Sequence, residues 1–295
     1  MAEPRVVGIL SPGDMGSAIG RVLREGGLDV VTCLDGRSEL TRLRAAEAGL
    51  RDRPLDDLLA QADIVLSVLV PGEAVALAET VAQAMKRSGA RPVYADCNAI
   101  SPQTVQTIEG IITGAGGTFI DAGIIGAPPK TGAGGTRFHC SGPDTSAFQA
   151  LGRHGLNVHV VGREIGQASG LKMVYAASTK GTTALWTELL VAARAMGLER
   201  TLLAELGADN PVARQQLAGI PSMPRRARRW VSEMEEIAAT LAAIGLPPRM
   251  LEGAADIYRF IGETELANQT SREPDPALEQ ILETLASIVQ GRTAH

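Results

Sequence analysis

The first half of the chain alternates short apolar runs with helix-forming segments, and this alternation limits the fold more than any other feature. The apolar runs are rich in β-branched residues and end at Gly, Pro or polar residues; they span 5–10, 28–34, 62–70, 91–98, 117–126, 136–142 and 156–162. Unbroken apolar runs are typical of strands buried on both faces. Strands separated by helices favour parallel pairing. The pattern predicts an α/β fold with a doubly wound parallel sheet.

The second half changes character. From Gly166 onward no segment reads as a strand, and residues 168–197 predict one long helix. A later segment spaces its apolar residues at four and three positions, as the buried stripe of a helix does: Trp230, Met234, Ile237, Leu241 and Ile244. We therefore expect two domains, an α/β domain over residues 1–164 and an all-α C-terminal domain over residues 165–295.

Composition excludes several classes of protein. A net charge of −5 argues against a nucleic-acid binder, and no apolar run approaches the roughly 20 residues of a membrane-spanning helix. The start of the chain lacks the pattern of a secretory signal. Three widely spaced cysteines fit reduced thiols, so we expect a cytoplasmic protein. Neither the cysteines nor the histidines show metal-ligand spacing, and no metal site is expected.

The stretch "SPGDMG", residues 11–16, follows the first predicted strand and begins a predicted helix. A dinucleotide-binding turn has a tight first position, a second position that admits the pyrophosphate, and a third that lets the helix pack closely. Gly13 and Gly16 hold the second and third positions, but Ser11 replaces the usual first glycine. Free N–H groups at the helix start would face the phosphates. We interpret the stretch as a modified Rossmann-type turn.

The end of the second strand bears on cofactor choice. An acidic residue at this position commonly binds a ribose 2′-hydroxyl, and an arginine commonly binds a 2′-phosphate. This chain has Asp35 followed by Arg37 and Ser38, with Arg42 one turn later. The Arg–Ser pair suits a phosphate, so we expect NADP, with NAD as the alternative. In the simpler interpretation, Arg37 is a solvated turn residue and Ser38 only caps a helix.

Three further segments occur in order: "DCNAISPQTV" from Asp96, "DAGIIGAPPKTGAGGT" from Asp121, and "GQASGLKMVYA" from Gly166. With "SPGDMG", they resemble the motifs of the β-hydroxyacid dehydrogenase family, which includes 3-hydroxyisobutyrate dehydrogenase and the cofactor domain of 6-phosphogluconate dehydrogenase. The resemblance covers residues 5–195 well and the helical remainder only in architecture. It implies a Rossmann-type cofactor domain, an all-α substrate domain and a homodimer.

The resemblance also implies that a lysine on the long helix handles a proton while hydride moves to or from nicotinamide. That residue is Lys172, which lies among apolar and small residues. Burial there would lower the pKa of the lysine toward the working range; the alternative is a lysine that lies along the helix surface. The family's asparagine one turn later is replaced by Ala176. Tyr175, on nearly the same helical face as Lys172, is our candidate substitute.

The family's substrate loop also departs from its pattern. The position of a carboxylate-binding serine is held by Ile125, which has no hydroxyl, while Gly126 and Ala127 still offer backbone N–H groups. A carboxylate held without a donor is costly to bury. Lys130 is either a new positive anchor or an ordinary loop charge. The family's K-D-L-G motif is lost, and its place falls near Ser232 and Glu233.

The predicted function is a nicotinamide-dependent oxidoreductase that acts on the alcohol or carbonyl carbon of a small metabolite. Imine reduction on the same fold and a non-catalytic NAD(P) sensor are the alternatives. A cluster at Arg225, Arg226, Arg228 and Arg229 is either a phosphate contact or a solvated face, and the second interpretation is favoured. The predicted catalytic residues are Lys172 and Tyr175, and the predicted substrate contacts are Ile125, Gly126, Ala127 and Lys130. The predicted cofactor contacts are Ser11, Pro12, Gly13, Asp14, Met15, Gly16, Arg37, Ser38, Leu69, Val70 and Asn98.

Overall fold

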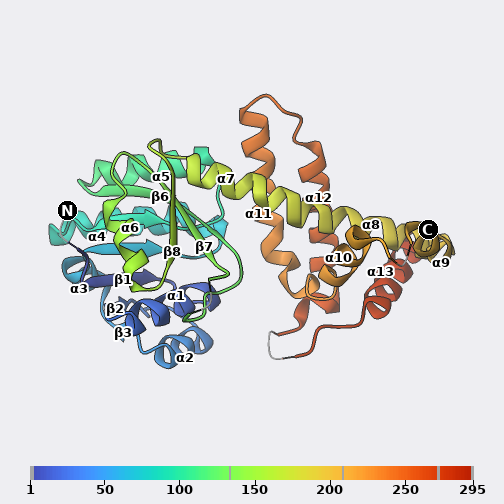
Figure 1. Cartoon of the computed structure of the whole chain (residues 1–295), viewed down its shortest axis with the longest axis horizontal. Helices are drawn as coiled ribbons and strands as arrows, with labels where there is room; N and C mark the ends of the chain where they lie inside the picture. Colours follow the sequence, from blue (N-terminus) through green and yellow to red (C-terminus); the bar gives the residue numbers. More distant parts are fainter. Residues whose placement is uncertain (1–2, 133, 208, 271–272, 294–295) are drawn as a thin grey trace. The chain divides into compact units, whose positions relative to one another are not determined.

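The computed structural model describes residues 3–132, 134–207, 209–270 and 273–293. The chain forms two compact units, Met1–Met173 and Val174–His295 (Figure 1). The first unit extends beyond the predicted domain boundary at residue 164 and includes the first turns of the long helix. The reason is local: Asp121 in the sheet accepts hydrogen bonds from the backbone N–H groups of Gly166, Ala168 and Ser169.

The described residues of the first unit form an eight-stranded sheet, which confirms the predicted α/β fold. In space the strands follow the order β3-β2-β1-β4-β5-β6-β7-β8. Their bounds are β1 Val6–Leu10, β2 Asp29–Thr32, β3 Arg51–Asp52, β4 Ile64–Ser67, β5 Val93–Asp96, β6 Thr118–Ile125, β7 Arg137–Ser141 and β8 Asn157–Gly162. The two-residue strand β3 was not predicted, because it is too short and polar to show an apolar pattern.

Two features of the sheet matter for the site. All pairings are parallel except β6 with β7, which is antiparallel. The fully parallel sheet predicted from the sequence is corrected at this point. Residues 126–136 return the chain without a helix in their described part, and parallel strands need a longer crossover. Strand order reverses between β1 and β4, the place where open α/β sheets bind ligands at the carboxyl ends of their strands.

Helices cover both faces of this sheet (Figure 1). One core forms where α1 (Asp14–Glu25), α2 (Glu39–Glu47) and α6 (Ser146–Ala150) pack on residues such as Ile9. The other forms where α3 (Leu55–Gln61), α4 (Ala74–Ser88) and α5 (Pro102–Gly114) pack on residues such as Val65. The short helices are η1 (Pro71–Glu73) and η2 (Leu151–His154). The two cores explain why the central strands are apolar on both sides.

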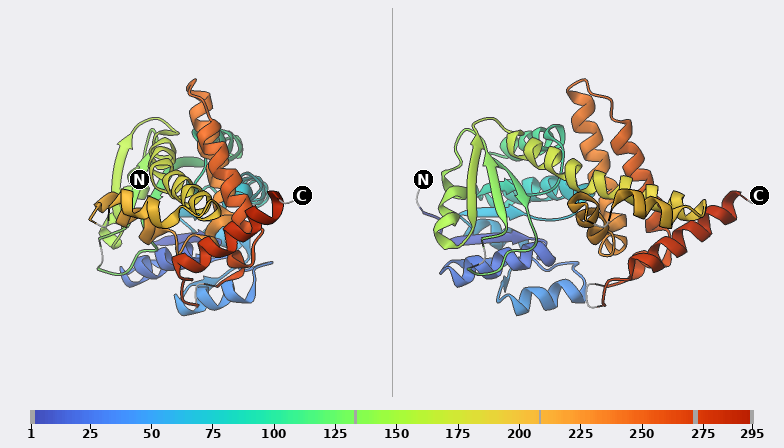
Figure 2. Two further views of the ribbon diagram at one scale, coloured as in Figure 1. Left: turned by 90° about the vertical axis from the view of Figure 1, so that its right-hand side faces the viewer. Right: turned by 45° about the vertical axis from the view of Figure 1, so that its right-hand side comes forward.

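The second unit is helical in its described residues. The long helix is not uniform as predicted: α7 (Gln167–Ala176) is followed by the π-helical turn η3 (Ala177–Gly181) and then α8 (Thr182–Ala195). The remaining helices are α9 Glu199–Leu206, α10 Pro211–Gly219, η4 Pro224–Arg226, α11 Ala227–Ala243, α12 Arg249–Gly262, η5 Glu265–Asn268 and α13 Leu278–Thr293. Helices α11 and α12 lie side by side as a hairpin (Figure 2). The predicted apolar stripe of α11 is buried at Trp230, Met234 and Ile237.

Candidate active site

The first βα turn, residues 11–16, has Ser11 where the usual motif has its first glycine. Ser11 has a φ of 66°, so it adopts the left-handed conformation that glycine usually supplies, and among the described residues no other non-glycine has positive φ. The Gly13 N–H donates to the Ser11 carbonyl at 2.8 Å and closes the turn. A Cβ on Gly16 would lie 2.7 Å from the Ser11 carbonyl oxygen, so only glycine lets α1 pass this close. The turn therefore keeps the expected shape.

The start of α1 suits an anionic ligand. Gly13 is the N-cap and makes no side-chain capping bond, which leaves backbone N–H groups of the first turn available to a ligand. A Cβ on Gly13 would meet nothing within 4 Å, so its side-chain position is open space. Asp14 in the first turn is paired with Arg44 at 2.6 Å, which offsets its negative charge. These residues fit the pyrophosphate of a dinucleotide.

The loops after β4 and β5 are joined through Asn98. Its Oδ1 accepts a hydrogen bond from the Leu69 N–H at 2.7 Å, and its Nδ2 donates to Ser67 at 2.9 Å and to Asp96 at 3.0 Å. Burial raises the pKa of Asp96 to about 7. Asn98 is buried, whereas Val70 is exposed beside these loops. The structure thus brings Leu69, Val70 and Asn98 to the same edge of the sheet as the α1 turn; contact with a cofactor stays a prediction.

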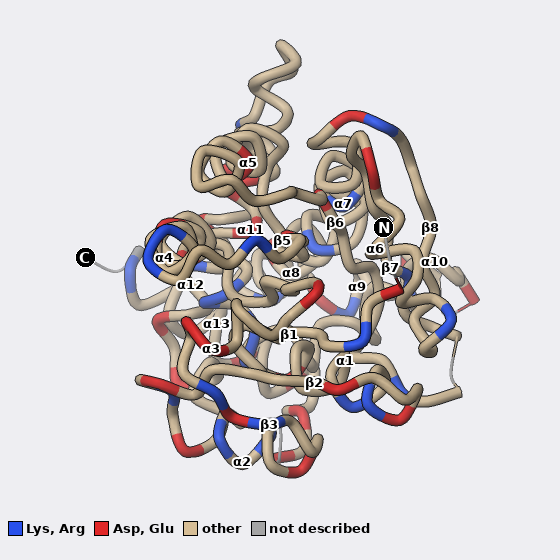
Figure 3. Tube along the Cα trace, turned by 90° about the vertical axis from the view of Figure 1, so that its left-hand side faces the viewer, with Lys and Arg blue, Asp and Glu red and all other residues tan. Residues whose placement is uncertain are grey.

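The turn after β2 is held by Arg42, which donates to the carbonyls of Leu34 (2.5 Å) and Arg37 (3.2 Å). Ser38 caps α2 by accepting a hydrogen bond from the Thr41 N–H at 3.3 Å. The Nε of Arg37 is buried and has no hydrogen-bond partner among the described residues. Charges of both signs alternate along α2 and β3, beside this turn (Figure 3). Arg37 therefore has a donor in this turn that a ligand could use.

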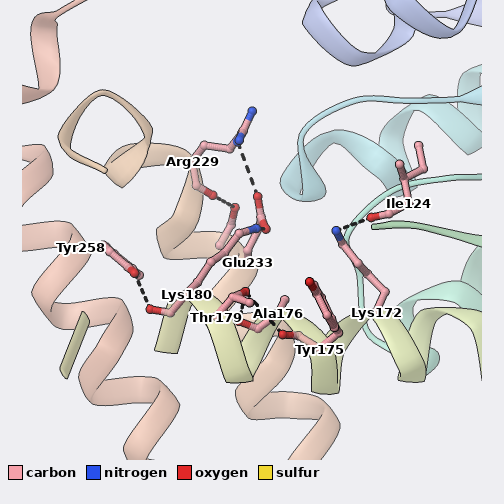
Figure 4. Close-up of polar contacts among 10 residues, drawn as sticks. Ile124, Lys172, Tyr175, Ala176, Thr179, Lys180, Arg229, Glu233 and Tyr258 are labelled. Atoms are coloured by element: carbon pink, nitrogen blue, oxygen red, sulfur yellow. Dashed lines mark hydrogen bonds and ion pairs between the residues drawn. The ribbon is translucent and has the colours of Figure 1, made fainter. Parts of the chain in front are cut away.

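Lys172 lies against strand β6. Its ammonium donates to the carbonyl of Ile124, near the carboxyl end of that strand (Figure 4). The close approach depends on Gly123, where a Cβ would lie 2.8 Å from the Ala168 carbonyl oxygen and 3.0 Å from the Lys172 Cβ. Because β6 is parallel to β5, its carboxyl end lies at the edge that also carries the α1 turn and Asn98. Lys172 is thus on the ligand edge of the sheet.

Asp121, also on β6, fixes the start of α7. Its carboxylate accepts hydrogen bonds from Ser141 Oγ and from the backbone N–H groups of Gly166, Ala168 and Ser169, at 2.9–3.1 Å. It also accepts one from Ser169 Oγ. A carboxylate at a helix N-terminus satisfies free N–H groups and complements the helix dipole. Burial raises the pKa of Asp121, while these hydrogen bonds act in the opposite direction. One strand therefore positions both α7 and Lys172.

Tyr175 and Ala176, which follow Lys172 in the sequence, differ in exposure to solvent. Tyr175 is exposed and belongs to the second unit, where its carbonyl accepts a hydrogen bond from Ser178 Oγ at 2.8 Å. Its partnership with Lys172 stays a prediction. Ala176 is buried and has no polar side-chain atom to replace the family's asparagine.

The substrate loop begins at the end of β6. Ile125 is buried, and its backbone is in register with that of Arg137 on β7. Gly126 has a φ of 129°, and the Ala127 carbonyl accepts a hydrogen bond from Thr136 Oγ1 at 2.5 Å. Lys130 is exposed and lines a cavity of about 480 Å³ beside α1 and α2, and neither Lys172 nor Ile125 lines that cavity. The predicted contact of Lys130 with a substrate stays a prediction.

The arginine cluster mainly ties loops together. Arg225 pairs with Asp275, and Arg228 donates to the Gly262 carbonyl at 2.8 Å and to Asn268 at 2.7 Å. Arg226 donates to Ser222 at 3.4 Å, and the half-exposed Arg229 pairs with Glu233 on the same helix at 3.5 Å. These contacts give all four arginines a structural role.

One polar cluster was missed by sequence reasoning. Lys180, in the π-helical turn η3, pairs with the buried carboxylate of Glu233 on α11 (Figure 4). The Tyr258 hydroxyl donates to the Lys180 carbonyl. The sequence signals were a lysine inside a long apolar helix and an acidic residue on the apolar side of α11, but neither predicts the other because they are far apart in the sequence.

Two kinds of feature are absent from the residues that the structure describes. No helix among the described residues is long and apolar enough to cross a membrane. Within the same residues, no three or more His, Cys, Asp or Glu side chains gather as they would around a metal ion.

The chain matches two family models and is similar to several known proteins. Residues 6–176 match the family model described as the NAD binding domain of 6-phosphogluconate dehydrogenase, and residues 193–261 match a domain of unknown function (DUF1932). The structure of conserved protein MTH1747, of unknown function and similar to 3-hydroxyacid dehydrogenases, shares 32% identity, covers 90% of this chain and 100% of that chain, and has a TM-score of 0.66. An uncharacterized 28.5 kDa protein from Methanothermus fervidus is 26% identical over 87% of this chain and 99% of its own.

More distant structures share the fold. Mycobacterium tuberculosis 3-hydroxyisobutyrate dehydrogenase with L-serine is 20% identical, covers 95% of this chain and 99% of its own, and has a TM-score of 0.67. The imine reductase from Myxococcus stipitatus in complex with NADP⁺ is 18% identical over 95% and 99%, with a TM-score of 0.58. A variant of that reductase was solved with NAD⁺. A nicotinamide cofactor is supported by the matching NAD-binding domain.

Proposed function

This chain belongs to the β-hydroxyacid dehydrogenase family, and from that premise we propose that it transfers hydride between NADP and the carbonyl or alcohol carbon of a small metabolite. The proposal rests on the position of Lys172. Its ammonium donates to a β6 carbonyl at the edge of the sheet where the α1 turn and Asn98 also lie. Hydride transfer to a carbonyl creates an alkoxide, and a proton donor positioned at its oxygen lowers the barrier to that step.

The bound nicotinamide would supply or accept the hydride. The chain's own part is to bind, orient and move a proton. The Ser11–Gly16 turn and the first N–H groups of α1 would hold the pyrophosphate. The ammonium of Lys172 would protonate the new alkoxide oxygen in reduction, and its amine would take up the alcohol proton in oxidation. Positioned proton transfer of this kind contributes about 10²–10⁴-fold to rates.

The preference for NADP over NAD rests on the turn after β2. The buried Nε of Arg37 has no partner among the described residues, and Ser38 lies next to it at the start of α2. A 2′-phosphate would supply the acceptor that this guanidinium lacks. Asp35 is exposed in the same turn, which leaves NAD as the alternative cofactor.

Two further proposals complete the account. Three exposed apolar side chains, Leu185, Leu189 and Met196, lie along one side of α8 and its end, and they support a homodimer that buries this stripe. Its test is the molar mass in solution by light scattering, with Leu189→Lys expected to yield monomers.

The cysteines Cys33, Cys97 and Cys140 are unpaired, which supports a cytoplasmic location.

The test of the proposed reaction is a substrate screen. Purified protein is mixed with NADPH or NADH and with panels of aldehydes, oxo acids and cyclic imines, and absorbance is followed at 340 nm, the band of the reduced cofactor. We expect turnover of an aldehyde or oxo compound with NADPH. Turnover of cyclic imines alone would favour the imine reductase instead. Tight NADPH binding with no turnover in any panel would favour a sensor.

A further inference from the structure

The carboxylate of Asp121 lies where strand β6 meets the start of helix α7, and it is fully buried. It accepts hydrogen bonds from the backbone N–H groups of Gly166, Ala168 and Ser169 at 2.9–3.1 Å, and one from Ser169 Oγ. Ser141 Oγ, on β7, donates to it at 2.9 Å. These contacts need an ionised carboxylate, because a protonated acid would place its own hydrogen among the donors. Asp121 is therefore a buried anion that ties together β6, β7 and α7.

Strand β6 holds helix α7 at a second point, one turn further along the helix. Lys172 follows Ser169 by three residues, and its ammonium donates to the carbonyl of Ile124 (Figure 4). Ile124 in turn follows Asp121 by three residues on the strand. Between the two attachment points, Gly123 lets the helix come close, because a Cβ there would lie 3.0 Å from the Lys172 Cβ. The position of the ammonium therefore depends on where the start of α7 is held.

Helix α7 has no carboxylate of its own to complete its N-terminus. Its first turn contains no acidic residue. The Gln167 side chain accepts a hydrogen bond from the Glu164 N–H at 3.1 Å, so it satisfies a group before the helix and not the N–H groups of the first turn. The negative charge that complements the helix dipole comes instead from Asp121 on β6. One side chain from a distant part of the sequence thus does what a local cap usually does.

We propose that Asp121 is a positioning residue for Lys172: its carboxylate fixes the start of α7, and through the helix it fixes the point at which the lysine exchanges a proton. The inference rests on the proposed proton transfer by Lys172. Asp121 does not exchange a proton with the substrate, because it is fully buried and its oxygens accept from protein donors. Loss of its carboxylate should slow the chemical step and spare cofactor binding, since the α1 turn follows β1 and not β6.

The first measurement observes Lys172 itself and needs no substrate. The chain has four lysines, Lys86, Lys130, Lys172 and Lys180, so full-length protein made with isotope-labelled lysine gives four Cε signals in a proton–carbon correlation spectrum. Lys172→Met identifies the signal of interest, and Lys86, exposed on α4, is the internal reference. We expect the Lys172 signal to move in Asp121→Ala and to move less in Asp121→Asn, because an amide oxygen still accepts the backbone hydrogen bonds. A Lys172 signal that stays in place in both variants would overturn the proposal.

Asn210→Ala is the matched control, because Asn210 also caps a helix. Its side chain accepts hydrogen bonds from the N–H groups of Val212 and Ala213, at 3.0 and 3.2 Å, at the start of α10. The variant should lower stability through the loss of a cap and leave the Lys172 signal where the parent has it. A shift as large as that of Asp121→Ala would mean that the signal reports general loosening, and it would also overturn the proposal.

The second measurement separates positioning from stability by kinetics. With the substrate found by screening, Asp121→Asn should lower the single-turnover rate about tenfold to a hundredfold, because the proton donor is misplaced, while NADPH affinity stays that of the parent. An unchanged rate, or a loss confined to NADPH affinity, would contradict the positioning role. If Asp121→Ala does not fold, Asp121→Asn and Ser169→Ala, which removes one donor, give the same comparison. If the parent turns over no substrate, the proposed reaction fails, and the Lys172 signal alone decides whether Asp121 positions the lysine.

Discussion

Two lysines, Lys172 and Lys180, come from one helix-forming stretch, yet the chain restrains them in different ways. Lys172, in the N-terminal unit, donates to a neutral backbone carbonyl of β6. Lys180, in the helical unit, contacts a buried carboxylate and lies over an aromatic ring. A neutral partner orients an ammonium without cancelling its charge, whereas a carboxylate both orients it and offsets one charge. The first arrangement suits proton transfer, and the second suits a structural ion pair.

The largest expected effect on stability tests the Lys180 side of this comparison. Lys180→Met leaves the buried Glu233 without its main partner, and losing one member of a buried ion pair costs about 3–5 kcal/mol in the free energy of unfolding. Urea denaturation measures it. Lys86→Met should stay within about 0.5 kcal/mol of the parent. Replacing both charges, as Lys180→Met with Glu233→Leu, should recover much of the loss; no recovery would contradict a buried ion pair.

The next effect is a pH dependence in the N-terminal unit. Burial, aided by the charge of Asp121, raises the pKa of Asp96 in the folded chain to about 7, above its unfolded value near 4. A raised carboxyl pKa means that the folded state binds the proton more tightly. The contribution to stability is therefore present below pH 4 and is lost as pH rises from 4 to 7.

Asp96→Asn tests this directly, because an amide does not titrate. Relative to this variant, the parent should lose about 2–4 kcal/mol of unfolding free energy between pH 4 and 7 and then stay level. Urea denaturation across that range measures the difference. Asp57→Asn, at an exposed position on α3, controls for general charge effects. If the parent instead loses stability relative to Asp96→Asn as pH falls, the pKa of Asp96 is not raised by folding.

A smaller effect tests how β6 holds Lys172. Gly123→Ala places a Cβ 2.8 Å from the Ala168 carbonyl oxygen, so α7 must move away from the strand. Such overpacking costs about 1–3 kcal/mol and should also reduce turnover, because Lys172 moves with α7. Gly110→Ala in α5 is the matched control, since its Cβ meets nothing within 4 Å. It should be neutral or stabilising. Equal behaviour of the two variants would show that the close approach is unimportant.

The smallest expected effect concerns cofactor choice. Arg37→Ala should weaken NADPH binding about tenfold, corresponding to about 1.4 kcal/mol, and leave NADH binding unchanged. Fluorescence titration of the reduced cofactors measures both affinities. Arg163→Ala, an exposed arginine in the same unit, should change neither. If Arg37→Ala leaves NADPH affinity unchanged, the preference for NADP loses its basis.

The same two regions show what sequence can predict. The alternation of strands and helices predicted the sheet, and the ordered motifs predicted the family, because both depend on local patterns that physical packing imposes. The modified turn was also predictable in outline, although only the structure shows that Ser11 itself takes the left-handed conformation of a glycine. The antiparallel β7 was missed because strand direction depends on the path of a connecting loop.

The polar cluster around Lys180 in the helical unit could not be predicted from local sequence patterns. Lys180 and Glu233 meet only through the packing of η3 against α11, and a π-helical turn has no sequence signature of its own. Trp230 was predicted to lie in a buried stripe and is buried as expected, and Tyr258 is buried beside it. Their added role beside a charged pair depends on which ring lies under Lys180. Contacts between distant segments are what local patterns leave out.

The most direct test of the role of Lys172 is hydride transfer by Lys172→Ala, measured in a single turnover at 340 nm with saturating NADPH and the substrate found by screening. We expect NADPH to bind as in the parent while the rate of the chemical step falls about 10²–10⁴-fold. A rate equal to that of the parent would contradict the assignment of Lys172 as the proton-transfer residue.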